Sequence, residues 1–149
     1  MLMRSTGAEE YGPLSQARLA AFESRFGITL PDEYRHFLIQ TNGGVPNRQV
    51  FDGNYLVRVF FGLHRGPRPE RLQWACRTYG GRMPSEIIPV GSDPFGNVFC
   101  VGVREGYQGK VYFWSHEQEG DEDEPATWDN VRPIAESFNS FLEGLRPLD

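Results

Sequence analysis

Apolar residues recur every three or four positions near the start of the chain, and this spacing predicts two successive helices. The first covers residues 15–26, with Leu19, Phe22 and Phe26 on one face, and Gly27 ends it. The linker to the second helix is too short for anything but a tight corner. We therefore expect the two helices to pack as neighbours.

The second helix has the most clearly marked ends. Pro31 suits a first helical position because it needs no partner for an amide hydrogen, and Asp32 and Glu33 complement the positive end of the helix dipole. The sequence Asn-Gly-Gly at 42–44 favours the left-handed conformation that stops a helix. The buried face is predicted to consist of Tyr34, Phe37, Leu38 and Thr41.

Farther along, β-branched and aromatic residues predict strands at 49–51, 55–61, 87–90, 97–103 and 110–114. The last three are joined by short turns, so they should form an antiparallel meander at the centre of a sheet, with both faces covered. Pro89 indicates that the strand at 87–90 is an edge strand or ends there. A helix over residues 70–79 separates the two groups of strands.

The C-terminal part returns to a spacing of three and four, which predicts a final helix from Pro133 that stops before Pro147. Its apolar face would consist of Ile134, Ala135, Phe138, Phe141, Leu142 and Leu145.

Composition adds limits to this outline. With 149 residues, 39% of them hydrophobic and 23% charged, the chain suits one domain over residues 1–149, with 1–14 as a loose N-terminal segment. Two cysteines, Cys76 and Cys100, predict reduced, buried thiols and no disulfide framework. The N-terminus has no apolar leader, and no stretch is long enough to cross a membrane, so we expect a cytoplasmic protein.

Charge is unevenly distributed along the sequence. The formal net charge is −5, and the segment 117–129 has seven acidic residues and no lysine or arginine. The segment 58–82 has six arginines and a single acidic residue, Glu70. We expect the stretch 117–125 to be a mobile, solvated loop, with Trp128 returning the chain to the body of the protein.

Known catalytic and metal-binding patterns are missing from the sequence. His116-Glu117 begins like a zinc-protease helix, but Gly120 stands where the second histidine would be needed. The acidic run at 121–124 lacks the glycine and terminal glutamate of a calcium loop. We therefore expect no catalytic residues, no metal and no cofactor, and we interpret His116 as a structural hydrogen-bonding residue.

The arginines allow two interpretations. Arg65, Arg68, Arg71, Arg77 and Arg82 lie near Trp74 and Tyr79, a mixture that suits single-stranded nucleic acid. The aromatic positions are also those that a core would use, so we favour a solvated helix face and do not expect nucleic acid as a partner.

A family resemblance appears in the second helix, in the string Leu-Pro-x-x-Tyr-x-x-Phe-Leu-x-x-x-Asn-Gly-Gly from Leu30 to Gly44. It resembles the signature of the SUKH superfamily, which includes bacterial toxin immunity proteins and fungal cell-wall assembly regulators of the Smi/Knr type. Segments 82–101, 110–117 and 134–142 are similar to its later blocks, in the same order. The resemblance implies an α+β fold, a curved, mostly antiparallel sheet packed with an N-terminal helix pair and a C-terminal helix, which agrees with the predicted elements.

For function, the resemblance implies a non-enzymatic binding protein, most commonly an immunity protein that neutralises a cognate toxin such as a nuclease. The alternative is a regulatory scaffold that binds an endogenous protein. Because nuclease toxins have basic clefts, an acidic loop could cover such a cleft and speed association. In the binding interpretation Trp114 and His116 line a groove. The candidate partner-binding residues are Glu117, Glu119, Asp121, Glu122, Asp123, Glu124, Trp114 and His116.

Overall fold

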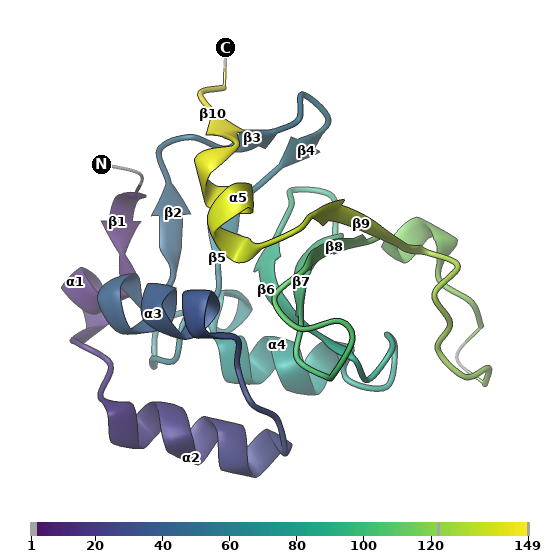
Figure 1. Ribbon diagram of the computed structural model, residues 1–149. Helices are drawn as coiled ribbons and strands as arrows, with labels where there is room; N and C mark the ends of the chain where they lie inside the picture. Colours follow the sequence, from purple (N-terminus) through teal and green to yellow (C-terminus); the bar gives the residue numbers. More distant parts are fainter. Residues whose placement is uncertain (1–2, 122, 149) are drawn as a thin grey trace.

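The computed structural model describes residues 3–121 and 123–148. Within them the chain forms a seven-stranded sheet and a three-stranded sheet, with helices packed around both (Figure 1). The strands are β1 (Met3–Thr6), β2 (Gly44–Pro46), β3 (Val50–Phe51), β4 (Tyr55–Leu56), β5 (Val59–Phe60), β6 (Ile87–Ser92), β7 (Val98–Gly102), β8 (Val111–Trp114), β9 (Val131–Ala135) and β10 (Leu145–Arg146). The helices are α1 (Gly7–Tyr11), α2 (Gln16–Phe26), α3 (Asp32–Thr41), α4 (Leu72–Tyr79) and α5 (Phe138–Glu143), with short 3-10 helices η1 (Arg68–Glu70) and η2 (His116–Gln118).

The large sheet has the order β1-β2-β5-β6-β7-β8-β9, and every neighbouring pair is antiparallel. The small sheet has the order β10-β3-β4. The predicted α+β class with a mostly antiparallel sheet is confirmed, and β6, β7 and β8 are the predicted central meander.

The helix pair follows its end signals closely. The Ser15 side chain accepts a hydrogen bond from the backbone of Arg18 and caps α2, and Gly27 ends the helix in the left-handed conformation. Pro31 is the N-cap of α3, so the helix begins at Asp32, one residue later than predicted, and Asn42 ends it at φ 50°. The two helices are tied together by an ion pair between Glu23 and Arg35.

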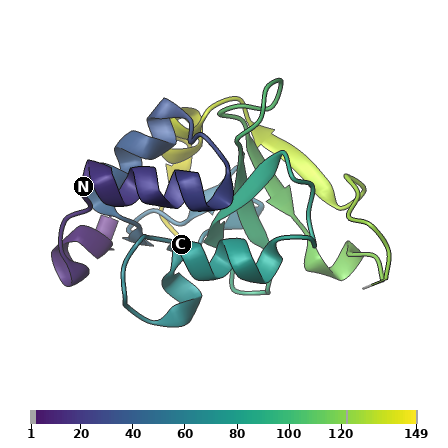
Figure 2. The ribbon, with the colours of Figure 1, turned by 90° about the horizontal axis from the view of Figure 1, so that it is seen from below.

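Helices cover both faces of the central strands (Figure 2). On one face Phe99 of β7 contacts Phe141 of α5, with ring centroids 5.4 Å apart. On the other face the thiol of Cys100 lies 3.9 Å from the sulfur of Met83, just after α4. Since all five residues of β7 are buried, the prediction that both faces are covered is confirmed.

The predicted strand at 55–61 is wrong as a single element. The chain forms β4, leaves the small sheet and enters the large one as β5. Between them, the Val57 amide donates to the carbonyl of Gln49, and the Arg58 amide donates to the carbonyl of Ser92. These residues bridge the two sheets, which one continuous alternation of apolar residues does not reveal.

The prediction that Pro89 marks an edge or a strand end is also wrong. β6 lies between β5 and β7 in the interior of the sheet. The register with β7 shifts between Pro89 and Gly91, so a bulge accommodates the residue that lacks an amide hydrogen.

The predicted final helix begins too early. Residues 131–135 form β9, an edge strand in which Pro133 pairs with Tyr112 at another register shift. The helix α5 starts only at Phe138, where the Ser137 side chain accepts a hydrogen bond from the amide of Ser140.

The N-terminal segment needs a correction as well, because residues 3–11 are not loose. β1 pairs with β2, and Met3 is buried. The Gly7 amide donates to the carbonyl of Gly43 at 3.0 Å, which fixes α1 against the end of α3. Residues 1 and 2 lie outside the described part of the chain.

Candidate functional site

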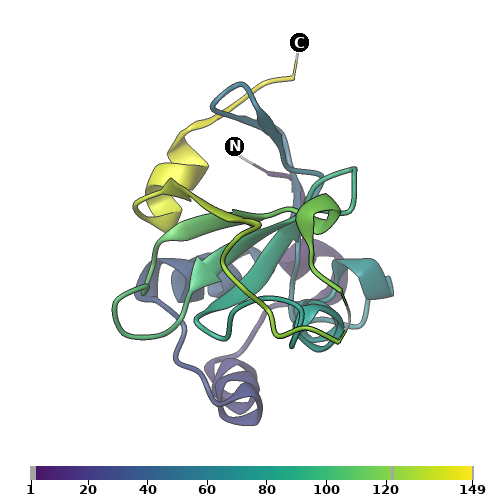
Figure 3. The same ribbon diagram turned by 90° about the vertical axis from the view of Figure 1, so that its right-hand side faces the viewer.

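One end of the large sheet gathers the turn between β6 and β7, the start of η2 and the residues after α4. Paired residues bring these segments together, because Val98 is opposite Trp114 and Trp114 is opposite Val131. Figure 3 shows the β6–β7 turn next to η2. Long loops between strands that end together are a common place for binding residues.

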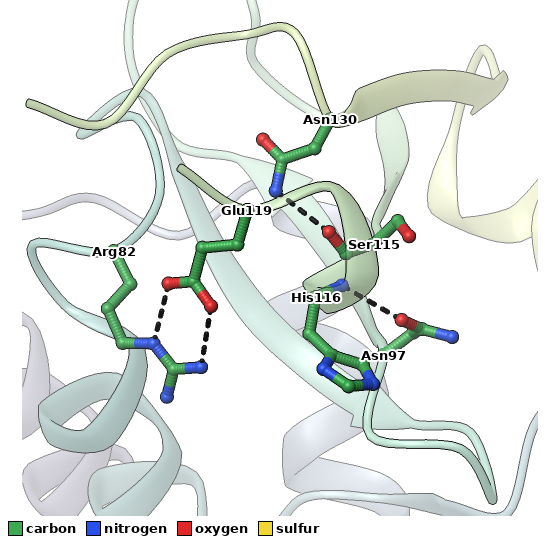
Figure 4. Close-up of polar contacts among 6 residues, drawn as sticks. All are labelled: Arg82, Asn97, Ser115, His116, Glu119 and Asn130. Atoms are coloured by element: carbon green, nitrogen blue, oxygen red, sulfur yellow. Dashed lines mark hydrogen bonds and ion pairs between the residues drawn. The ribbon is translucent and has the colours of Figure 1, made fainter. Parts of the chain in front are cut away.

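The acidic segment, residues 117–129, leaves this end of the sheet through a closed base. The Ser115 amide donates to the carbonyl of Asn130 at 3.0 Å, and Asn130 Nδ2 donates to the carbonyl of Ser115 at 2.9 Å (Figure 4). Asn130 is buried, so these two hydrogen bonds are shielded from water. The acidic segment is therefore fixed where it starts and where it ends.

An ion pair attaches the acidic segment to the turn that follows α4. Arg82 Nε donates to Glu119 Oε2 at 2.9 Å and an Arg82 terminal nitrogen donates to Oε1 at 3.0 Å, the two-pronged geometry that suits a carboxylate (Figure 4). The same guanidinium lies 5.0 Å from the ring centre of Tyr79 and 5.3 Å from that of Trp114. The hydrogen bonds from Arg82 lower the pKa of Glu119.

A cleft of about 600 Å³ opens between this ion pair and the outer part of the acidic segment. Its lining has four carboxylates and one guanidinium, so its walls are mainly negative. The lining residues are Gly81, Arg82, Gln118, Glu119, Gly120, Asp121, Glu124, Pro125, Ala126, Thr127, Asp129 and Asn130.

A smaller hollow of about 170 Å³ continues from the cleft. The two share Gln118, Asp129 and Asn130. The second hollow adds Tyr55 and Phe113, whose ring centroids are 4.9 Å apart, so it brings apolar surface beside the acidic cleft.

The structure brings some of the predicted residues together and separates others. Glu119, Asp121 and Glu124 line the cleft, whereas Glu117 and Asp123 are exposed outside the lining. Glu122 lies outside the described residues. The described residues of the stretch 117–125 are thus solvated as expected, except that Glu119 is half-buried and held in place by Arg82.

The two non-acidic candidates differ in exposure. Trp114 is fully buried, so it does not line a groove that a partner could enter. His116 is exposed at the start of η2, and its amide donates to Oδ1 of Asn97 at 2.9 Å. A backbone contact of this kind orients the segment but leaves the imidazole at the surface.

The arginines of segment 58–82 do not share one surface role. Arg71 donates from Nε to the carbonyl of Gly66 at 2.6 Å, and Arg82 pairs with Glu119. Trp74 is partly buried against the core, and Tyr79 contacts the ring of Trp114. These contacts use the side chains inside the protein, so they favour the structural interpretation of the segment.

The described residues include three histidines and two cysteines, side chains that often bind metals or act as nucleophiles. No group of three or more histidine, cysteine or acidic residues could hold a metal ion there. Both cysteines are free and buried, and burial raises the pKa of Cys76 to about 12 and that of Cys100 well above its usual value. None of the helices in the described ranges has the length and apolar character needed to traverse a bilayer.

Comparison with known proteins decides the family. Residues 13–144 match the model of the SMI1 / KNR4 family (SUKH-1). The chain belongs to this family. It is also 38% identical over 122 residues to YokK, an uncharacterized protein derived from the SPbeta prophage of Bacillus subtilis (strain 168). That alignment covers 67% of this chain and 61% of YokK, so the chain spans less than two thirds of its relative.

The SUKH-1 match includes the cleft and the whole acidic segment, whereas β1 and α1 precede it. Sequence reasoning missed three residues of this region: Arg82, Asn130 and Phe95. Arg82 had been grouped with the other arginines. Phe95 had a detectable signal, because it is an aromatic residue in the short turn that the sequence predicts between the strands at 87–90 and 97–103, where no strand pattern requires one.

Proposed function

We propose that this SUKH-1 protein is an immunity protein that binds a bacterial toxin domain directly and blocks it, without catalysis. The observation that supports this most strongly is the cleft whose walls carry Glu119, Asp121, Glu124 and Asp129. Family membership and the prophage origin of YokK agree with such a role.

Electrostatics provides the mechanism. A nuclease toxin presents a basic cleft to its substrate, and a protein surface rich in carboxylates competes for that cleft. Because the acidic segment is closed at its base by Ser115 and Asn130, its charges are presented in a limited volume. The proposed partner is therefore a toxin domain with a basic surface, of which a nuclease is an example.

The ionisation of Glu119 supports binding over catalysis. A general acid at neutral pH needs a carboxyl group with a raised pKa. Glu119 has the opposite shift, because its hydrogen bonds with Arg82 lower its pKa. A carboxylate that stays charged is suited to attract a basic partner.

The first experiment is a pull-down with the tagged chain from its native cell at moderate salt, followed by calorimetry on the protein that is recovered. A stoichiometric complex with a toxin domain, with a Kd near 1 nM and loss of toxicity, is the expected result. Recovery of housekeeping proteins alone would contradict the proposal and favour a regulatory scaffold.

The acidic segment is then tested by charge reversal. Changing Asp121, Glu122, Asp123 and Glu124 to lysine should slow association at least about 10-fold at low salt, with a smaller effect at high salt. The matched control changes four exposed glutamates elsewhere, Glu9, Glu105, Glu136 and Glu143, and alters the net charge equally. Equal slowing in both variants would show that only the total charge matters and would contradict a role for this segment.

A further inference from the structure

Phe95 is the most exposed large hydrophobic side chain among the described residues, with 68% of its surface accessible. Single exposed apolar residues are common on protein surfaces, so exposure alone does not indicate a site. What distinguishes Phe95 is the rigidity of the backbone that presents it.

Asp93 fixes the turn between β6 and β7 from inside. Its carboxylate is buried and accepts hydrogen bonds from the amides of Phe95 and Asn97, both at 2.8 Å, and from Asn97 Nδ2 at 2.9 Å. The Asp93 amide in turn donates to the carbonyl of Asn97 at 3.0 Å. Gly96 supplies the positive φ of 90° that closes the turn.

The same turn is coupled to the acidic segment. Asn97 donates from Nδ2 to Asp93 and accepts at Oδ1 from the His116 amide at 2.9 Å (Figure 4). A Cβ built on Gly96 would lie 3.1 Å from the imidazole of His116, so the turn and η2 are in contact. The position of Phe95 relative to the first residues of the acidic segment is therefore fixed.

We propose that Phe95 is the apolar anchor of the interface, inserted into an apolar pocket on the partner that is bordered by lysine and arginine side chains. A few residues, often aromatic, that fill pockets on the partner typically supply most of the energy of an interface. The turn pre-orders the backbone that carries the ring, so little backbone freedom is lost on binding. This inference rests on the proposed function, since it assigns a contact to the same partner.

Charge favours this partner over two other surfaces that could contact the ring of Phe95. A second copy of the chain would bring another acidic segment against the first, and like charges repel. A membrane surface is itself negative and would also repel the neighbouring carboxylates. A protein with a basic rim around an apolar pocket satisfies both the ring and the charges.

The contact is tested first in the native cell with a photo-crosslinking phenylalanine, benzoylphenylalanine, in place of Phe95 in the tagged full chain. Leu148, which is 60% accessible, provides the control position. We expect an adduct at 95 only, with mass spectrometry placing the attachment in an apolar segment that has lysine or arginine near it in the folded partner. No adduct at 95, equal yields at both positions, or attachment to lipid or to a second copy would overturn the inference.

The partner that the crosslink identifies is then purified on its own, and its binding kinetics are measured with Phe95→Ala and with Leu148→Ala. Phe95→Ala should speed dissociation at least about 30-fold and leave the association rate within about 2-fold, whereas Leu148→Ala should change neither. An unchanged dissociation rate for Phe95→Ala would overturn the anchor, although neutralisation of a toxin by the wild type would still support the proposed function. If the purified partner has no toxic activity but dissociates faster from Phe95→Ala than from the wild type, the role of Phe95 as an anchor is supported and the proposed function is overturned.

Discussion

Arg82 and Glu119, 37 positions apart in the sequence, form a two-pronged ion pair that joins the turn after α4 to the acidic segment. The arginine side chain is 41% accessible and the glutamate 25%. Partial exposure limits the stabilisation from such a pair, because water and salt screen it. Its main effect is to place one wall of the cleft.

The ion pair predicts a small, pH-dependent change in stability. Glu119→Gln should reduce the free energy of unfolding by no more than about 1 kcal/mol at pH 7. Because the pKa of Glu119 is lower in the folded protein than its ordinary 4.5, the stabilisation is present above that pH and disappears as the pH falls through the folded-state value. Urea unfolding of both proteins from pH 3 to pH 7 measures this difference.

Glu117→Gln is the matched control, since Glu117 is exposed in η2, the 3-10 helix that ends just before Glu119. It should leave the free energy of unfolding within about 0.5 kcal/mol of wild type. A difference between Glu119→Gln and wild type that stays constant down to pH 3 would contradict the assignment to ionisation.

Asp93 should matter far more for stability than the acidic segment. Asp93→Ala leaves the amides of Phe95 and Asn97 without their buried acceptor, so we expect a loss of about 2–4 kcal/mol. Asp121→Ala, at an exposed position, should cost less than about 0.5 kcal/mol. Equal unfolding midpoints in urea for the two variants would disprove the role given to the turn.

The N-terminal contact predicts a steric effect at Gly7. A Cβ there would lie 2.0 Å from the backbone oxygen of Asn42, so Gly7→Ala must displace α1 or α3. We expect a loss of about 3 kcal/mol or more in calorimetric unfolding. Gly120→Ala is the control, because its Cβ would meet only the flexible end of Glu124. A Gly7→Ala protein as stable as wild type would indicate that residues 3–11 detach easily.

Both thiols should be unreactive in the folded protein. Burial raises the pKa of Cys76 to about 12 and raises that of Cys100 well above its usual value, so almost no thiolate exists at pH 8. Ellman's reagent should label neither cysteine in buffer and both in concentrated urea. Rapid labelling of one cysteine without denaturant would contradict its burial.

Sequence patterns predicted those elements whose ends are set by local chemistry. The cap at Ser15 and the left-handed stop at Asn42 act within a few residues, and both helices were placed to within one residue. The central meander followed from short turns between apolar runs. These features need no knowledge of distant parts of the chain.

Errors arose where pairing with a distant strand decided the outcome. Ile134 and Ala135 continue the apolar spacing of α5 by coincidence, but they belong to β9, which pairs with β8. Pro89 is tolerated inside the sheet because a bulge removes the need for its amide hydrogen, and no local pattern reveals a bulge.

In the candidate site, too, local features were predicted and contacts between distant segments were not. The acidic residues were visible as a run of charge, and four of them line the cleft. Arg82 was recognised as charged, but its partner Glu119 lies far along the chain, so the ion pair could not be predicted. Trp114 and His116 were expected to line a groove together, yet Trp114 is the last residue of β8 and is buried, whereas His116 lies beyond the strand in η2 and is exposed.

The closed base at Ser115 and Asn130 also affects how this protein can evolve. The two hydrogen bonds isolate residues 116–129 from the register of β8 and β9. Insertions there lengthen a surface loop, and substitutions change its charge. Both cost little folding free energy, because the entropic cost of closing a loop depends only weakly on its length. A lineage whose partner changes its surface can therefore follow that change by altering one loop, while the sheet and core stay the same.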